Sequence, residues 1–236
     1  QVDMAKESDA AEEYERQATL QALQSQINPH FLYNTLECIR GQALMDGNTS
    51  VAYMLEALGN FFRYSISRRE NVVTLADEIN NIRSYMLIQN YRFLNRYRFE
   101  LEYLEDEEPL LGCYVPKLTL QPIVENALIH GFQNQKSGCV TLTVDASDSM
   151  LMLTVSDDGE GMDTAVLDEL NRKIQSRQTL LRKPASHGNG IALQNVNRRI
   201  MMLYGRSYGL HVYSTPGRGT DVEIILPRIT KAEVMT

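Results

Sequence analysis

Residues 151–162 read LMLTVSDDGEGM, an apolar run that leads directly into two aspartates and two glycines. The run predicts a strand over Leu151–Ser156. A carboxylate at the end of a buried strand, such as Asp157, can accept a hydrogen bond from an exocyclic amine, and glycines let the backbone approach a planar ring closely. The alternating oxygen ligands of a calcium loop are missing. The stretch therefore predicts either a site for a flat polar ligand or a plain acidic turn.

A second stretch, residues 120–131, reads LQPIVENALIHG and has the apolar spacing of a helix. Its apolar residues should face a sheet, which turns Glu125, Asn126 and His130 towards other surroundings. An amide oxygen with a nearby carboxylate suits a magnesium ion that is ligated mainly by water and nucleotide phosphate. The alternative is a solvated polar face that ends at Gly131.

Two glycine motifs follow, GNGI at residues 188–191 and GRGT at residues 217–220. The first opens a helix, where backbone N–H groups can bind phosphate and glycines permit close approach. A third glycine and a preceding strand are missing, so a dinucleotide-binding fold is disfavoured. The second motif is as consistent with a plain hairpin turn as with a role in ligand binding.

The C-terminal half alternates between predicted strands and helices, which indicates a mixed α+β sandwich with strands in one layer and helices in the other. Pro116 is well placed in the first turn of a helix that runs to His130. The long polar stretch Asp157–Asn189, with a short helix near Thr164–Ile174, is typical of a functional loop. Further strands are expected at Tyr97–Leu104, Val140–Ala146, Leu210–Ser214 and Thr220–Leu226, a turn at Glu105–Pro109, and a helix at Ile191–Tyr204.

The N-terminal half is predicted to be helical. One amphipathic helix covers about residues 11–45, a turn follows at Asp46–Asn48, and Ser50 could cap a second helix with the stripe Val51, Leu55, Leu58, Phe62 and Ile66. One such hairpin has no closed core, so two copies are expected to pack as a dimeric four-helix bundle. Thr74 with Asp77 and Glu78 indicates a capping box at the start of a third helix, Leu75–Asn95.

His30 lies in the first of these helices, in the sequence QINPHFLYN. Pro29 lacks an N–H group and loosens the helix beside it. Asn34 lies one turn further on the same face, where its amide could hydrogen-bond the imidazole or a bound water. Because neutral imidazole is a good nucleophile, His30 is a candidate reactive group; the alternative is a histidine in the first turn of a new helix.

Composition narrows the choice of function. The net charge is −7 and no basic block is present, which argues against direct binding of nucleic acid. Three widely spaced cysteines indicate reduced thiols in a cytosolic protein. No apolar run is long enough for a membrane span, and the beginning resembles no signal peptide. We expect the chain to be part of a longer protein.

The combination of NPHFLYN, LQPIVENALIHG, SDDGEGM, GNGIALQNV and GRGT resembles the sensor histidine kinases of the LytS/YesM type over nearly the whole chain. The resemblance implies a GHKL or Bergerat-type ATP-binding domain at residues 97–230. It also implies a signalling helix and dimerisation hairpin at residues 1–70, and a linking helix at residues 71–96 with the segment IQNYRF around Arg92. The implied cofactors are ATP and Mg²⁺.

The resemblance also implies roles for individual residues. His30 would be the phosphoacceptor, Asn126 the Mg²⁺ ligand and Asp157 the carboxylate that reads adenine; Thr220 would support adenine through water. The backbone cradle and lid hinge would include Gly159, Gly161, Gly188 and Gly190. His130 is a further candidate for nucleotide binding, and Asn34 for positioning a water in dephosphorylation of a regulator.

Two departures from family patterns affect the expected chemistry. Many members carry a lysine where this chain has Ile129, so charge neutralisation would fall to Mg²⁺, His130 or Arg198. Many other histidine kinases carry an acidic residue directly after the phosphoacceptor, where this chain has Phe31, and Glu125 is the candidate general base.

The expected partners are a second copy of the chain, bound through the N-terminal helices, and the receiver domain of a response regulator. The expected location is the cytoplasmic portion of a bacterial sensor that is anchored in the membrane by an upstream segment. Three other interpretations remain open: a nucleotide-binding dimeric scaffold without catalysis, a GHKL-type ATPase without phosphohistidine, and a kinase that acts mainly as a phosphatase on its regulator.

Overall fold

The structure is a computed structural model that describes residues 29–67, 71–176 and 190–230. It divides into two compact units with the boundary between Ile66 and Ser67. Among the described residues, no helix combines the length and hydropathy that crossing a bilayer requires. Expectations for residues 1–28, and for Gly188 in the long polar stretch, lie outside the described residues.

The first unit contains the helical hairpin that the sequence predicts. Helix α2 (Pro29–Met45) and helix α3 (Thr49–Ile66) contact each other across the turn at Gly47, whose φ is 73°. The helix cap is Asn48 rather than Ser50, because the Asn48 side chain accepts the Val51 N–H at 3.3 Å. Buried residues in the unit are mostly small: Leu36, Ala43, Ala52, Leu55, Ala57 and Gly59.

The predicted stripe of the second helix is therefore only partly correct, since Leu55 is buried while Leu58 and Phe62 are half-buried. Large apolar side chains remain on the surface, among them Phe31 (70% exposed), Tyr53 (65%) and Met45 (77%). A single hairpin leaves this much apolar surface because two helices bury only one stripe of each.

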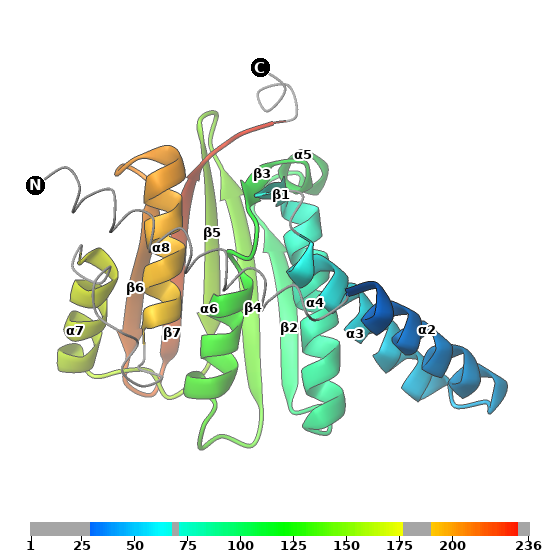
Figure 1. Cartoon of the computed structure of the whole chain (residues 1–236). Coiled ribbons are helices and arrows are strands. Elements are labelled where there is room, and N and C mark those ends of the chain that lie inside the picture. Colours follow the sequence, from blue (N-terminus) through cyan, green and yellow to red (C-terminus); the bar gives the residue numbers. More distant parts are fainter. Residues whose placement is uncertain (1–28, 68–70, 177–189, 231–236) are drawn as a thin grey trace, which may run out of the picture. The chain divides into compact units, whose positions relative to one another are not determined.

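The second unit is built on a five-stranded mixed sheet in the order β2-β4-β5-β7-β6 (Figure 1). Its strands are β2 (Tyr97–Tyr103), β4 (Gly138–Ala146), β5 (Met150–Asp157), β6 (Gly209–Thr215) and β7 (Gly219–Pro227). The pair β2 and β4 is parallel and the other pairs are antiparallel. In the register of β5 and β7, Asp157 lies opposite Thr220, so both residues stand at one end of the sheet.

Helices cover one face of this sheet (Figure 1). Helices α4 (Leu75–Arg92), α6 (Gln121–Asn126) and α8 (Ile191–Tyr204) contact one another in succession, and α7 (Thr164–Gln175) contacts α8. A π-helical turn, η1 (Ala127–Gly131), continues α6 without a break. The α+β class and the mixed sheet are confirmed. Residues in β4 alternate between buried and half-buried, so its buried side faces the core.

Two local expectations were wrong. Pro116 does not open a helix but ends the short strand β3 (Tyr114–Pro116), which pairs with β1 (Val72–Thr74). The helix begins at Gln121, and its first turn contains Pro122, whose missing N–H needs no partner there. The acidic segment after β2 forms the short helix α5 (Glu107–Leu111) rather than a turn. The capping box on α4 is confirmed, with Thr74 and Asp77 bonding reciprocally.

Candidate nucleotide-binding site

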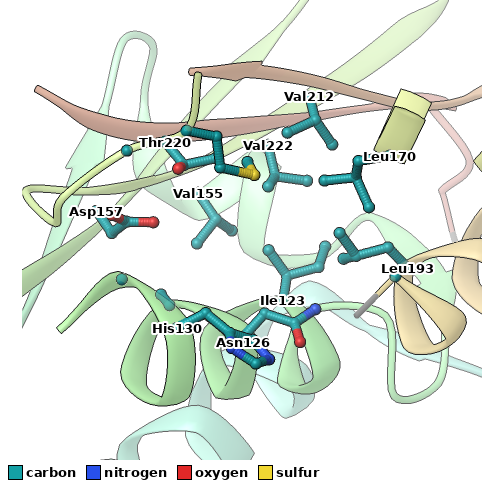
Figure 2. A pocket seen from close by; sticks show the side chains of 15 residues that line it. Ile123, Asn126, His130, Val155, Asp157, Leu170, Leu193, Val212, Thr220 and Val222 are labelled. Carbon is teal, nitrogen blue, oxygen red and sulfur yellow. The ribbon is translucent and has the colours of Figure 1, made fainter. Parts of the chain in front are cut away.

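A pocket in the second unit lies between the end of the sheet and the helices α6 and α8, and its volume is about 660 Å³ including the part open to solvent. Six of the residues predicted for the nucleotide site line it: Asn126, His130, Asp157, Gly161, Gly190 and Thr220. Figure 2 shows Asp157 and Thr220 on the strand side and Asn126 and His130 on the helix side. The remaining lining is largely apolar, with Ile123, Val155, Leu170, Leu193, Val212 and Val222. A flat, partly apolar ligand fits such a lining.

Asp157, for which the sequence predicts a buried carboxylate, ends β5 and is half-buried. Its Oδ1 accepts the Gly159 N–H at 2.9 Å. Burial raises the pKa of Asp157 to about 6, while the backbone N–H groups of Gly159 and Thr220 lower it. The group can therefore accept a hydrogen bond from a ligand amine as a partly desolvated carboxylate near neutral pH.

Glycines around Asp157 leave the space that the carboxylate needs. A Cβ at Gly159 would lie 2.4 Å from the Gly131 carbonyl oxygen and 2.5 Å from Asp157 Oδ1. A Cβ at Gly219 would lie 1.8 Å from the Asp157 carbonyl oxygen. Both contacts are with backbone or a fixed side chain, so the glycines are required for this packing.

Thr220 reaches the pocket as part of a small hydroxyl network. Its Oγ1 lies 3.0 Å from Ser214 Oγ, which also donates to the Gly219 carbonyl and accepts the Met162 N–H. Gly161 lies beside this network with φ of 66°. Ser214 was not singled out in the sequence, because a serine within a strand pattern carries no signal of its own.

Asn126 and His130 stand on the helical run formed by α6 and η1. The Nδ2 atom of Asn126 is buried and has no hydrogen-bond partner in the structure. Among the described residues, no group of three or more His, Cys, Asp or Glu side chains could hold a metal. An amide oxygen such as that of Asn126 suits Mg²⁺, which accepts most of its ligands from phosphate and water.

At the other side of the pocket, Gly190 caps helix α8 with φ of 99°. A Cβ there would meet Leu170 Cδ1 at 2.7 Å, so the glycine brings the start of α8 close to α7. Leu193 of α8 lines the pocket one turn later. Gly190, at the start of α8, therefore lies at the pocket boundary.

The reactive histidine predicted from the sequence belongs to the first unit, on the exposed surface of α2. Asn34 Nδ2 lies 3.3 Å from His30 Nδ1 and 3.5 Å from Nε2. This pair matches the predicted spacing of one helical turn. Glu125 lies on α6 in the second unit, half-buried, and does not line the pocket; its Oε1 accepts from Gln121 Nε2 at 2.8 Å.

One group that holds the site was missed in the sequence. Glu78 is completely buried, and its carboxylate accepts the N–H groups of Leu118, Thr119 and Leu120 just before α6. The available signal in the sequence is that Glu78 directly precedes Ile79, an apolar residue of α4. Because Glu78 also lies close to Thr74, the sequence predicts only a local role for it in the capping box.

Comparison with known proteins agrees with this geometry. The family described as histidine kinase matches residues 18–97. The family described as histidine kinase-, DNA gyrase B- and HSP90-like ATPase matches residues 116–230. Sensor histidine kinase YesM of Bacillus subtilis is 36% identical over 213 residues, which are 90% of this chain and 34% of that protein. Sensor protein LytS of Bacillus anthracis is 32% identical over 89% of this chain and 34% of its own length.

A solved histidine kinase domain from Erythrobacter litoralis is 19% identical, covers 85% of this chain and 86% of that one, and has a TM-score of 0.45.

The sheet, its helical layer and the pocket at the sheet end define an ATPase domain of the histidine kinase, gyrase and HSP90 kind. The chain belongs to the sensor histidine kinases of the LytS/YesM type. It spans about one third of the length of these curated relatives.

Proposed function

We propose that the chain catalyses the ATP-dependent phosphorylation of its own His30. The observation that carries the proposal is the pocket in the ATPase domain, which brings Asp157, Thr220, Asn126 and His130 together from three separate parts of the sequence. The histidine-kinase match at residues 18–97, which contains the pair His30 and Asn34, supports the assignment of the acceptor.

Each pocket residue has a proposed task. Asp157 accepts a hydrogen bond from the adenine amine, and Thr220 supports this contact through water. Gly161 and Gly190, which line the pocket, let the backbone approach the nucleotide, and the same task is proposed for Gly159 and Gly188. Asn126 is proposed to hold Mg²⁺, which supplies charge neutralisation at the phosphates when bound. His130 adds a polar contact at the same end of the pocket.

The transfer step forms a bond between an imidazole nitrogen of His30 and the γ-phosphorus of ATP. The bond from that phosphorus to the β,γ-bridging oxygen breaks, and ADP leaves with the electron pair. The ring proton passes to a base, for which Glu125 is our candidate, or to water. Catalysis of this kind depends mainly on positioning and charge stabilisation. Asn34 is proposed to orient the imidazole ring.

The phosphohistidine is proposed to donate its phosphoryl group to an aspartate in the receiver domain of a response regulator.

We propose a homodimer through the N-terminal helices, supported by the exposed Phe31, Tyr53 and Met45 on the hairpin. The proposed location is the cytoplasm, where ATP is available, as part of a sensor anchored in the membrane. Asn34 would also position water for removal of the phosphoryl group from the regulator.

Labelled ATP with Mg²⁺ tests the proposal directly. The protein should acquire a phosphate that is lost in acid and survives base, and His30→Gln should abolish it. His211→Gln is the matched control, because His211 is an exposed histidine on β6 outside the pocket and should leave labelling intact. Release of inorganic phosphate without labelling would indicate a simple ATPase, and binding without turnover a scaffold; either result contradicts the proposal.

A further inference from the structure

The helical run Gln121–Gly131, which carries Asn126 and His130, is held at its beginning by a side chain from another helix. The Glu78 carboxylate of α4 accepts the N–H groups of Leu118 at 2.5 Å, Thr119 at 2.9 Å and Leu120 at 2.9 Å. Leu120 is the N-cap residue of α6, and Leu118 and Thr119 belong to the turn that leads into it. A negative charge is favourable at a helix N-terminus, and Glu78 holds the entry to α6 from 40 residues away in sequence.

The same turn is held from two further directions. Leu118 adopts a left-handed conformation with φ of 58°, which a leucine keeps only when its surroundings enforce it. Its carbonyl accepts from Arg199 of α8 at 2.8 Å. One turn along α4, Asn81 Nδ2 donates to Gln121 Oε1 at 2.9 Å. The start of the run is thus fixed by α4 and α8 together.

The other end of the run is held by a positive charge from the segment that follows α4. Arg96 donates through Nη2 to the Phe132 carbonyl at 2.5 Å and to the Gln135 carbonyl. The last carbonyls of a helix have no partner within it and favour a cation. A single stretch of chain, from Glu78 to Arg96, therefore supplies a carboxylate at the N-terminal end of the pocket helix and a guanidinium group at its C-terminal end.

Asn126 lies between these two attachments. Its Nδ2 atom has no hydrogen-bond partner, so that atom does not fix the amide, and the placement of Asn126 depends on the helical run that carries it. We propose that Glu78 and Arg96 are positioning residues that set Asn126 for the Mg²⁺–nucleotide complex. This inference rests on the proposed function, because it takes Asn126 as the Mg²⁺ ligand.

The test compares nucleotide affinity with and without the metal. ATP binding is measured by calorimetry in Mg²⁺ and in EDTA. The dissociation constant in EDTA divided by the dissociation constant in Mg²⁺ reports the contribution of the metal. Glu78→Gln should reduce this ratio by about tenfold, the order of effect of one lost hydrogen bond to a charged group. Affinity in EDTA should change little, since Asp157 and Thr220 lie on the sheet. Retained binding in EDTA also shows that the variant is folded.

Asp77→Ala is the matched control. Asp77 is the acidic neighbour of Glu78 on α4, but it bonds to Thr74 in the capping box of α4 itself. It should lower the melting temperature without changing the Mg²⁺ ratio. Should Glu78→Gln fail to fold, Arg96→Gln carries the same prediction, and Arg96→Lys should restore part of the ratio because it keeps the charge.

Asn126→Ala separates this proposal from the one it rests on. If Asn126→Ala leaves the Mg²⁺ ratio unchanged, the assignment of the metal ligand is wrong. If Asn126→Ala removes the metal contribution while folded Glu78→Gln and Arg96→Gln keep it at the wild-type value, the positioning role is overturned. An equal fall in the ratio for Asp77→Ala would also overturn it, because general loss of stability would then explain the effect.

Discussion

The Gly159 N–H donates to the Asp157 carboxylate at 2.9 Å, so the loop after β5 folds back onto the side chain that ends the strand. The Gly131 carbonyl at the end of the pocket helix lies against the same glycine. Strand end, loop and helix end therefore meet around one carboxylate, with no space for a side chain at the central residue.

Gly159→Ala should abolish ATP binding and destabilise the ATPase domain by about 1–3 kcal/mol, the usual cost of overpacking. The added Cβ would meet the Gly131 oxygen at 2.4 Å and Asp157 Oδ1 at 2.5 Å. Calorimetric titration and chemical denaturation measure the two effects. Gly112→Ala is the control, because φ is −79° there and the nearest atom to a new Cβ is 3.7 Å away. Normal ATP affinity in Gly159→Ala would contradict the described packing.

Asp157→Asn should raise the stability of the protein at neutral pH and abolish ATP binding. The folded state raises the pKa of Asp157 from 3.8 to about 6, chiefly by burial, so it binds the proton more tightly than the unfolded chain does. The contribution of this group to the free energy of unfolding should therefore be fully present below the unfolded pKa and be lost as the pH rises through about 6. The variant removes this fall and should be about 1–2 kcal/mol more stable than wild type at pH 7, after allowance for solvent screening.

Denaturation at a series of pH values, from 4 to 8 in the assay buffer, measures the effect at about 25 °C. The two proteins should converge towards the acid end of the series, and the variant should bind no ATP at the neutral end. Parallel stability profiles for wild type and Asp157→Asn would show that burial does not disfavour this carboxylate.

Asn34→Ala should slow phosphorylation of His30 by about tenfold without changing ATP affinity, because it removes only the orientation of the ring. The amide lies 3.3 Å from His30 Nδ1 on the surface of α2, in a different unit from the pocket. Single-turnover labelling measures the rate. Asn60→Ala, an exposed asparagine on α3, should have the wild-type rate. An equal loss in both variants would remove the special role of Asn34.

Ile129→Lys should strengthen ATP binding about three- to tenfold while AMP binding stays unchanged, since an added cation attracts the β and γ phosphates. Ile129 is 59% exposed in η1, next to His130, so a lysine is tolerated there. Met150→Lys adds the same charge at the far end of β5 from Asp157 and should have no effect. A gain that persists for AMP would point to non-specific attraction.

Much of the ATPase fold could be predicted from patterns that act locally. The capping box at Thr74 placed α4, and the glycine-led start of α8 at Ile191 matched the structure. The start of the pocket helix was misplaced because Pro116 satisfies the local rule for a first turn, while the turn that leads into this helix is held by Glu78, far away in sequence. A contact from another helix leaves no periodic signal.

The pocket residues were predicted for a similar reason. Asp157, Gly161 and Gly190 belong to short motifs whose residue types are chemically unusual at those positions, and all three line the pocket. Ser214 and Arg96 were not predicted, because their roles depend on the pairing of strands and on the end of a helix in three dimensions.

The most direct test of the central claim locates the phosphoryl group itself. After incubation with ATP and Mg²⁺, the protein is digested with trypsin at neutral to basic pH, and the peptide of residues 17–40, in which His30 is the only histidine, is fragmented by mass spectrometry. The account predicts a phosphoryl group on His30, absent in Asn126→Ala and lost after acid treatment. A phosphoryl group on another residue, or none while ATP is bound, would contradict it.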